Sequence, residues 1–281
     1  MSKKKKRIWF WVLSGAWTFI KTSAGLIWEI IKLPYYLIIG SYWLAKRINR
    51  KLEKENKKRK EKKKRGSMHA HYNGFKIIKK GSGNFETWEN KIKNSDSTIG
   101  IILGARGSGK TAFGMKMIEN IYAKTGKKIY TMGFYADDLP AWITAVNDIK
   151  EISNNSFVLI DEGGVLFNSR NAMSKPNKLL SQLLLISRHK NLNIIFISQN
   201  SSNLEINVLR QADYLVLKKS SLLQQEFERM IIQKLYKSLS QDFEELGKDK
   251  GLSYIHSTDF YGFVSNPLPS FWKTEISKAF R

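Results

Sequence analysis

The chain has 281 residues, no cysteine, and 48 Lys and Arg against 24 Asp and Glu, which gives a net charge of +24 at pH 7. The lack of cysteine excludes disulfides, thiolate metal sites and thiol nucleophiles. The length suits one sizeable α/β domain plus an appendage. The charge is uneven, since residues 1–65 carry +16 and residues 66–281 carry +8. The body is therefore an ordinary, mildly basic domain, and the amino-terminal quarter is the unusual part.

Residues 1–45 combine a basic start, KKKKR at 3–7, with a long apolar stretch rich in Trp, Tyr and Ile. The longest uncharged runs have 13 residues each, fewer than the ~20 that a simple spanning helix needs. Polar positions recur every three or four residues, which predicts a helix with one polar stripe. We expect a membrane-associated helical segment that lies in the interface or forms a short hairpin. The alternative is a water-soluble amphipathic helix packed on the domain.

Residues 46–66 form a highly basic linker, with 13 basic and 3 acidic side chains between 46 and 65. Such a run suits a solvated helix, a contact with anionic lipid, or a contact with nucleic acid. Basic residues on both flanks of the apolar segment place those flanks on the cytoplasmic side of a host or virion membrane. We expect the following domain on that side as well, with its core at 67–220 and a completing carboxyl-terminal part at 221–281.

From residue 98 onward, short apolar runs alternate with helical stretches, which predicts an α/β fold with a parallel sheet flanked by helices. The expected strands are 98–103, 127–134, 156–162, 193–199 and 213–219. The expected helices are 112–126, 139–150, 177–190 and 221–239. The segment 260–273, FYGFVSNPLPSFWK, has aromatic residues between prolines. It either docks on a partner or covers the protein's own core.

The stretch GARGSGKT at 104–111 matches the P-loop pattern G-x-x-x-x-G-K-[ST] at every fixed position, and it lies between an expected strand and an expected helix. In such a loop, backbone N–H groups and a helix amino terminus surround phosphate. We expect Lys110 to reach the β- and γ-phosphates of ATP and Thr111 to bind Mg²⁺. The predicted nucleotide-binding residues are Gly104, Ala105, Arg106, Gly107, Ser108, Gly109, Lys110, Thr111 and Ala112.

The sequence FVLIDE at 157–162 places two carboxylates at the end of a buried strand. In a sheet of this type that strand end lies beside the phosphate loop. We expect Asp161 to hold Mg²⁺ and Glu162 to polarise the attacking water. An acidic pair after a strand can also be a plain helix cap. Together with the loop, however, the pair favours hydrolysis over nucleotide binding alone.

Further catalytic candidates come from the ends of other elements. Gln199 ends the expected strand NIIFISQ, where it suits contact with the γ-phosphate or the attacking water. Phosphoryl transfer also gains from an arginine, often supplied by a neighbouring subunit. Arg170, Arg188 and Arg210 are the candidates for that role.

The order of these motifs resembles the FtsK–HerA superfamily of pumping ATPases, and most of all its zonular occludens toxin (Zot)-like branch, which includes filamentous-phage assembly ATPases. The more specific block is LLISRHKNLNIIFISQ with the following LRQADYLVL, in which Arg188, His189, Gln199 and Arg210 match the branch. The resemblance implies a RecA-like P-loop core, a ring of subunits, often six, and ATP-driven movement of DNA through or beside a membrane. One departure is that the apolar segment precedes the ATPase domain here, whereas phage relatives usually carry it afterwards.

The sequence therefore predicts a membrane-attached ATPase that translocates DNA as a homo-oligomeric ring, in viral genome packaging or extrusion or in DNA transfer by a mobile element. Viral or secretion-channel proteins are the expected partners. One alternative is an ATP-driven virion-assembly or protein-secretion motor, whose ATP turnover would be indifferent to DNA. A further alternative is a nucleotide-switched membrane scaffold, for which Glu162 would be dispensable.

Overall fold

The computed structural model describes residues 65–162, 184–204 and 206–277, most of residues 41–63, and six isolated positions before them: 17, 21, 23, 28, 32 and 34. It divides the chain into two compact units, Met1–Glu61 and Lys62–Arg281. Residue 170 and the first part of the helix expected at 177–190 lie outside the described residues. Residues 184–190 are helical.

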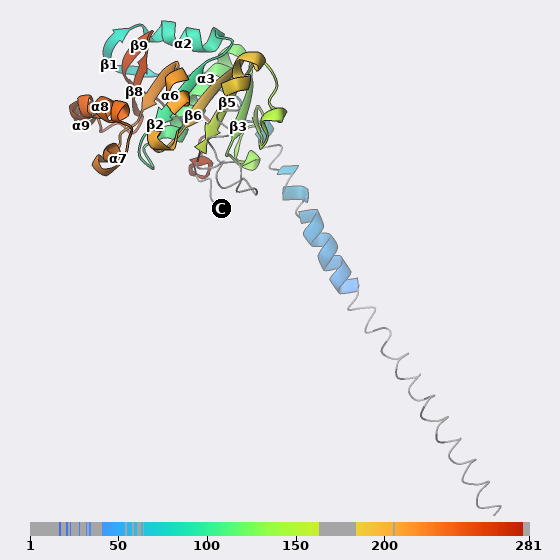
Figure 1. The fold of residues 1–281 in the computed structure, drawn as a ribbon. Helices are drawn as coiled ribbons and strands as arrows, with labels where there is room; N and C mark the ends of the chain where they lie inside the picture. The colour runs from blue at the N-terminus through green and yellow to red at the C-terminus, as the bar shows by residue number, and fades with distance from the viewer. Residues whose placement is uncertain are drawn as a thin grey trace, which may run out of the picture. The chain divides into compact units, whose positions relative to one another are not determined.

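The second unit is built on one nine-stranded sheet with the strand order β1-β9-β8-β7-β2-β6-β5-β3-β4 (Figure 1). The strands are β1 (Lys76–Gly83), β2 (Ile99–Leu103), β3 (Lys128–Met132), β4 (Ile143–Ala145), β5 (Ser156–Asp161), β6 (Leu192–Ile197), β7 (Tyr214–Leu217), β8 (Leu252–Ser257) and β9 (Phe260–Ser265). The helices are α2 (Phe85–Asn94), α3 (Lys110–Thr125), α6 (Ile206–Gln211), α7 (Leu222–Glu226), α8 (Met230–Ser238) and α9 (Ser240–Glu245). Short 3₁₀ turns occupy Ala136–Asp138, Ile149–Glu151, Ser201–Asn203 and Thr274–Ser277.

The strands from β7 to β4 in this order are parallel. The sequence predicted all of them except β4. The prediction of an entirely parallel sheet is nevertheless wrong, because β8, β9 and β1 extend the sheet as an antiparallel meander beyond β7. The segment 260–273 begins as strand β9, and its Phe271 is buried, so this segment covers the protein's own core.

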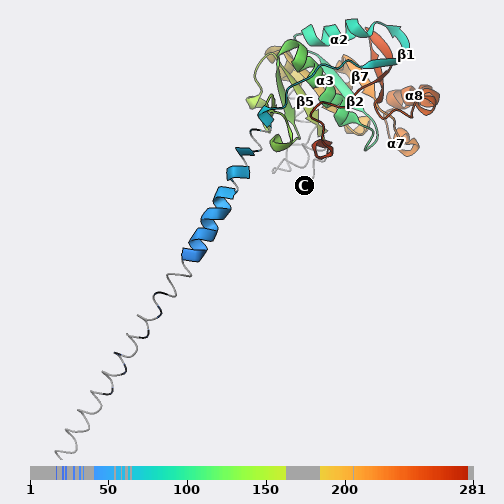
Figure 2. The same cartoon turned by 180° about the vertical axis from the view of Figure 1, so that it is seen from behind.

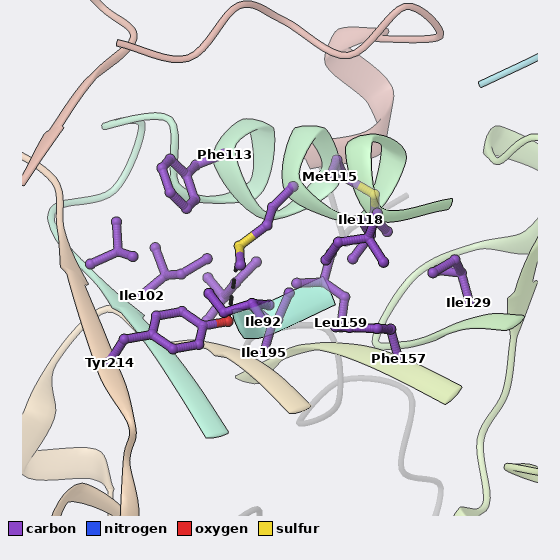
Figure 3. Packing of buried hydrophobic residues seen from close by; sticks show 14 of the residues in the cluster. Ile92, Ile102, Phe113, Met115, Ile118, Ile129, Phe157, Leu159, Ile195 and Tyr214 are labelled. Atoms are coloured by element: carbon purple, nitrogen blue, oxygen red, sulfur yellow. Dashed lines mark hydrogen bonds between the residues drawn. The ribbon is translucent and has the colours of Figure 1, made fainter. Parts of the chain in front are cut away.

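The two faces of the sheet are covered by different helices, because side chains alternate along each strand. In β2, Ile101 packs on the side of α6, α8 and α9, whereas Ile102 packs on the side of α2 and α3. Figure 3 shows α3 lying over Ile102, Leu159 and Ile195, which come from β2, β5 and β6. The view in Figure 2, from behind that of Figure 1, shows the same layer of α2 and α3.

Two predicted helices are wrong. The segment 139–150 forms edge strand β4 and a 3₁₀ turn instead, since Ile143 pairs with Ile129 of β3. The single helix expected at 221–239 is split into α7 and α8. The break falls at Glu228 and Arg229. The carboxylate of Glu228 accepts from the N–H of Ser201, and the N–H of Arg229 donates to the hydroxyl of Ser201 in place of a helical hydrogen bond.

Of the amino-terminal unit, the structure describes a helical stretch at residues 41–53 with exposed aromatic side chains. Lys46 Nζ lies 5.4 Å from the ring centre of Trp43 and 5.8 Å from that of Tyr42. Within the described part of the chain, no helix has both the length and the apolar character needed to cross a bilayer. Most of the segment expected to associate with the membrane, residues 1–45, lies outside the described residues.

Candidate functional site: a phosphate loop with two carboxylates

The loop between β2 and α3 depends on three glycines with positive φ, namely Gly104 at 149°, Gly107 at 76° and Gly109 at 91°. Residues other than glycine rarely adopt these backbone conformations. A Cβ atom on Gly104 would also lie 2.6 Å from Cβ of Lys218. The loop therefore requires glycine both for its turns and for the close approach of Lys218, at the end of the neighbouring strand β7.

Lys110 starts α3 and folds back over the loop, where its Nζ donates to the carbonyl oxygens of Gly104 at 2.7 Å and Ala105 at 2.8 Å. The side chain is buried, and burial lowers the pKa of Lys110 to about 8, although nearby Asp161 and Glu162 oppose this shift. An ammonium held by neutral carbonyls in a buried site is well placed to exchange them for an anion.

Thr111 and Asp161, the two residues expected at Mg²⁺, lie side by side. The hydroxyl of Thr111 donates to Oδ2 of Asp161 at 3.4 Å. The sheet explains this, because Asp161 of β5 is in register with Ile197 of β6, and Ile197 is in register with Ile102 of β2. Strands β2, β6 and β5 thus bring the loop and the carboxylates together at their carboxyl ends.

Glu162 is 7% exposed and lies at these same strand ends. Its carboxylate accepts a hydrogen bond from the hydroxyl of Ser198, and Asn203 also bonds to it. Burial raises the pKa of Glu162, and these two hydrogen bonds oppose the rise. A buried carboxylate with fixed partners and a raised pKa has the character of a general base.

Sequence reasoning missed Ser198 and Asn203. It singled out Gln199, but β6 ends at Ile197, and Gln199 is exposed. The backbone carbonyl of Gln199 accepts from Nε2 of Gln224. A signal was present in the order Ser-Gln after the strand, because successive side chains point in opposite directions and only one of the two can face the neighbouring strand's Glu162.

The segment that carries Ser198 and Asn203 is tied to the junction of α7 and α8. Glu228 accepts from both the N–H and the hydroxyl of Ser201, and the N–H bond is 2.7 Å long. The guanidinium of Arg229 donates to the carbonyl oxygens of Ser201 and Leu204. The position of Glu162 therefore depends on contacts that reach into the carboxyl-terminal part of the chain.

The structure does not bring the two described arginine candidates, Arg188 and Arg210, to this site. Arg188 lies in the helical turn before β6, and Arg210 lies in α6 before β7. Both strands run parallel to β2. These exposed arginines therefore lie at the amino-terminal ends of the strands, whereas the phosphate loop lies at the carboxyl end of β2. At ~3.3 Å per residue the separation from the loop is on the order of 15 Å. Arg106 is exposed on the loop itself.

The residues present fit a magnesium nucleotide. The hydroxyl of Ser108 is buried in the loop with no hydrogen-bond partner among the described residues, which suits a phosphate oxygen as acceptor. The hydroxyl of Thr111 and the carboxylate of Asp161 are oxygen donors of the kind that Mg²⁺ prefers. The 16-residue helix α3 directs its amino terminus at the same place.

Comparison with known proteins gives one sequence match. Residues 136–222 match the family model described as zonular occludens toxin (Zot), which is less than a third of the chain. No curated protein sequence matches. The expected resemblance to Zot-like ATPases is confirmed over that segment. With the phosphate loop and the carboxylates beside it, the match defines a P-loop ATPase.

Several solved structures are similar in part. The DNA-packaging ATPase from Sulfolobus turreted icosahedral virus is 16% identical, with coverage of 62% of this chain and 99% of that one and a TM-score of 0.40. The amino-terminal domain of zonular occludens toxin from Neisseria meningitidis is 22% identical, with coverage of 43% and 76% and a TM-score of 0.29. The pCW3 conjugation coupling protein TcpA is 11% identical, with coverage of 64% and 62% and a TM-score of 0.45. At these scores the likenesses decide nothing about this chain's chemistry.

Proposed function

We propose that the chain is a membrane-attached motor that hydrolyses ATP and uses the energy to translocate DNA. The observation that carries the hydrolytic part is the meeting of the phosphate loop with two carboxylates. Thr111 contacts Asp161, and the buried Glu162 is held beside them by Ser198. A binding protein or a scaffold has no need of a buried base at that place.

Each side chain has one task in this proposal. The ammonium of Lys110 turns from the loop carbonyls to the β- and γ-phosphates. Thr111 and Asp161 would hold Mg²⁺, which supplies positive charge to the phosphates when bound. Glu162 orients the attacking water and takes its proton, while Ser198 and Asn203 fix the carboxylate.

Two features support DNA as the cargo. Residues 136–222 match the Zot family model, in line with the resemblance to DNA-moving ATPases read from the sequence. Residues 46–65 carry a net charge of +10, and the described ones are helical and mostly exposed. A row of exposed Lys and Arg of this density suits a phosphate backbone. Membrane attachment is assigned to residues 1–45, where aromatic side chains flank basic runs.

We further propose that the active form is a ring. Arg188 and Arg210 lie at the amino-terminal ends of the parallel strands, away from the chain's own phosphate loop at the carboxyl ends. An arginine at those amino-terminal ends can act on a nucleotide only in a neighbouring copy, which a ring provides.

The test measures ATP turnover of the full chain in lipid vesicles, with and without double- and single-stranded DNA. We expect DNA to stimulate turnover severalfold, with the preferred strand type indicating the substrate. Lys110→Ala should abolish nucleotide binding, and Glu162→Gln should retain binding but lower turnover about a thousandfold. The exposed carboxylate of Glu226 supplies a matched control, since Glu226→Gln should change neither quantity.

Turnover that ignores both kinds of DNA would overturn the translocase proposal and favour a protein or virion cargo. Slow turnover that is unaffected by Glu162→Gln would instead indicate a nucleotide-switched scaffold.

A further inference from the structure

A second lysine, Lys218, lies beneath the phosphate loop. It directly follows β7, and its side chain is 1% exposed. Its backbone N–H donates to the carbonyl oxygen of Leu103 at 2.8 Å, and the next carbonyl, of Lys219, accepts from the N–H of Ala105 at 3.2 Å. The end of β7 is thereby fixed to the start of the loop.

The side chain of Lys218 runs along the underside of the loop from one end to the other. A Cβ atom on Gly104 would lie 2.6 Å from Cβ of Lys218, and one on Gly109 would lie 3.6 Å from its Nζ. Gly109 is the residue that caps the amino terminus of α3. The ammonium thus lies beside the amino terminus of α3, on the inner side of the loop.

The ammonium has neutral acceptors only. Its Nζ donates to the carbonyl oxygen of Gly251 at 3.0 Å and to Oδ1 of Asn266 at 2.9 Å. Among the described residues, no carboxylate oxygen lies within 4 Å of it. Asp249 acts on it from a longer distance, and burial lowers the pKa of Lys218 to about 7. An ammonium carries three protons, and these contacts use two of them.

A buried charge without a carboxylate partner costs several kcal/mol, and an apolar side chain of similar size would usually fill such a place more favourably. A positive charge becomes favourable here once a polyanion binds on the other side of the loop. The field of the ammonium then adds to that of the helix terminus and of Lys110.

We propose that Lys218 is a positioning residue for nucleotide: from beneath the loop it holds Gly104 and Gly109 in place and strengthens the attraction of the loop for a triphosphate without touching it. This inference rests on the proposed ATPase function and names a residue of the same site that the P-loop pattern does not contain.

The experiment measures binding of ATPγS, ADP and AMP to the full chain by titration calorimetry, together with the melting temperature. Lys218→Met keeps an unbranched side chain, one atom shorter, and removes the charge. We expect it to weaken ATPγS binding about tenfold, which corresponds to ~1.4 kcal/mol. The loss should be smaller for AMP, and the melting temperature should stay the same or rise.

Asn266→Asp is the second variant, because it leaves Lys218 in place and sets a carboxylate against its ammonium. The new ion pair should cancel much of the field at the loop and weaken ATPγS binding in the same direction. Lys219→Met is the matched control, since this neighbouring lysine is exposed, and we expect no change in binding. If Lys218→Met fails to fold, Asn266→Asp decides by itself.

Wild-type affinity in both Lys218→Met and Asn266→Asp would overturn the inference. A loss confined to Lys218→Met and accompanied by a lower melting temperature would also overturn it, since Lys218 would then be a structural residue only. Failure of the proposed function is a separate result, in which the wild-type chain binds no ATPγS or Lys110→Ala binds it normally.

Discussion

Strands β2, β5 and β6 end at the phosphate loop and at Asp161 and Glu162, whereas strands β1, β8 and β9 supply none of these groups. The parallel strands gather the reactive groups because their carboxyl ends share one edge. The antiparallel strands close the core over the flank of the sheet, where Phe263 packs against Tyr254 and Phe243. The two parts meet at Lys218, whose backbone bonds to β2 and whose ammonium bonds to Gly251 and Asn266 beside β8 and β9.

The comparison teaches that chemistry and stability are separated within one sheet. Changes in the antiparallel part should lower stability and leave turnover per folded molecule intact. Changes at the carboxyl ends of the parallel strands should lower turnover and leave stability intact. Four substitutions test this separation, beginning with the largest expected effect.

The largest effect is expected at Phe263 in the antiparallel part, which is 2% exposed. Phe263→Ala removes a ring that contacts Tyr254 and Phe243, at centroid distances of 5.0 and 5.1 Å. We expect a loss of about 3 kcal/mol in the free energy of unfolding, measured by denaturant titration. Turnover per folded molecule should remain unchanged at low temperature. Phe263→Leu, as a control, should lose less, and a large fall in turnover in either variant would contradict the separation.

The next effect is expected at Ser198 in the parallel part. Ser198→Ala removes the hydroxyl that donates to Glu162. A hydrogen bond to a charged group contributes ~1.5 kcal/mol, so we expect turnover to fall about tenfold while ATPγS affinity is retained. Ser187 provides the control because it is also buried, and among the described residues its hydroxyl donates to the carbonyl oxygen of Leu184 and not to Glu162. Equal losses in Ser198→Ala and Ser187→Ala would remove the assigned role of Ser198.

At the junction, Lys218 should make stability depend on pH. Burial lowers its pKa to about 7 in the folded chain, against an ordinary value of 10.5, so between these values the unfolded chain binds more protons. Stability should therefore rise with pH above 7, by ~1.4 kcal/mol per pH unit at most for this group. Asp249 is the carboxylate that opposes the shift, and the hydroxyl of Tyr236 bonds the carbonyl oxygen of Lys218.

The measurement compares Lys218→Met with wild type by denaturant titration from pH 6 to pH 9. We expect the variant to be more stable than wild type at the low end and the gap to narrow as pH rises. A difference in the free energy of unfolding that stays constant over this range would contradict the lowered pKa of Lys218.

The smallest effect is expected for the exposed ion pair between Lys91 of α2 and Asp259 of the turn between β8 and β9, at 2.7 Å. The side chain of Lys91 is 55% exposed, so solvent screens the pair. Lys91→Met should change the free energy of unfolding by less than ~1 kcal/mol. A larger loss in the same denaturant titration would mean that surface charges, besides the apolar core, hold the antiparallel part in place.

The sequence alone determined the elements whose chemistry is local. The spacing of Gly104, Gly109 and Lys110 defines the loop because only glycine tolerates its backbone angles. The buried run before Asp161 predicted a central strand, because a strand covered on both faces must be apolar throughout. These two motifs and the alternation around them were enough to predict the parallel strands other than edge strand β4, whose segment reads as a helix.

Tertiary structure decided what depends on contacts between distant segments. The segment 260–273 could not be read as strand β9 without its partners β8 and β1, since its aromatic residues suit either a surface or a core. Ser198 acquires its role only when β5 and β6 stand side by side. The break between α7 and α8 arises because Glu228 and Arg229 bond to Ser201, and no propensity of the helix itself predicts it. Lys218 shows the same limit, because its position beneath the loop follows from strand order, which one residue in a sequence does not reveal.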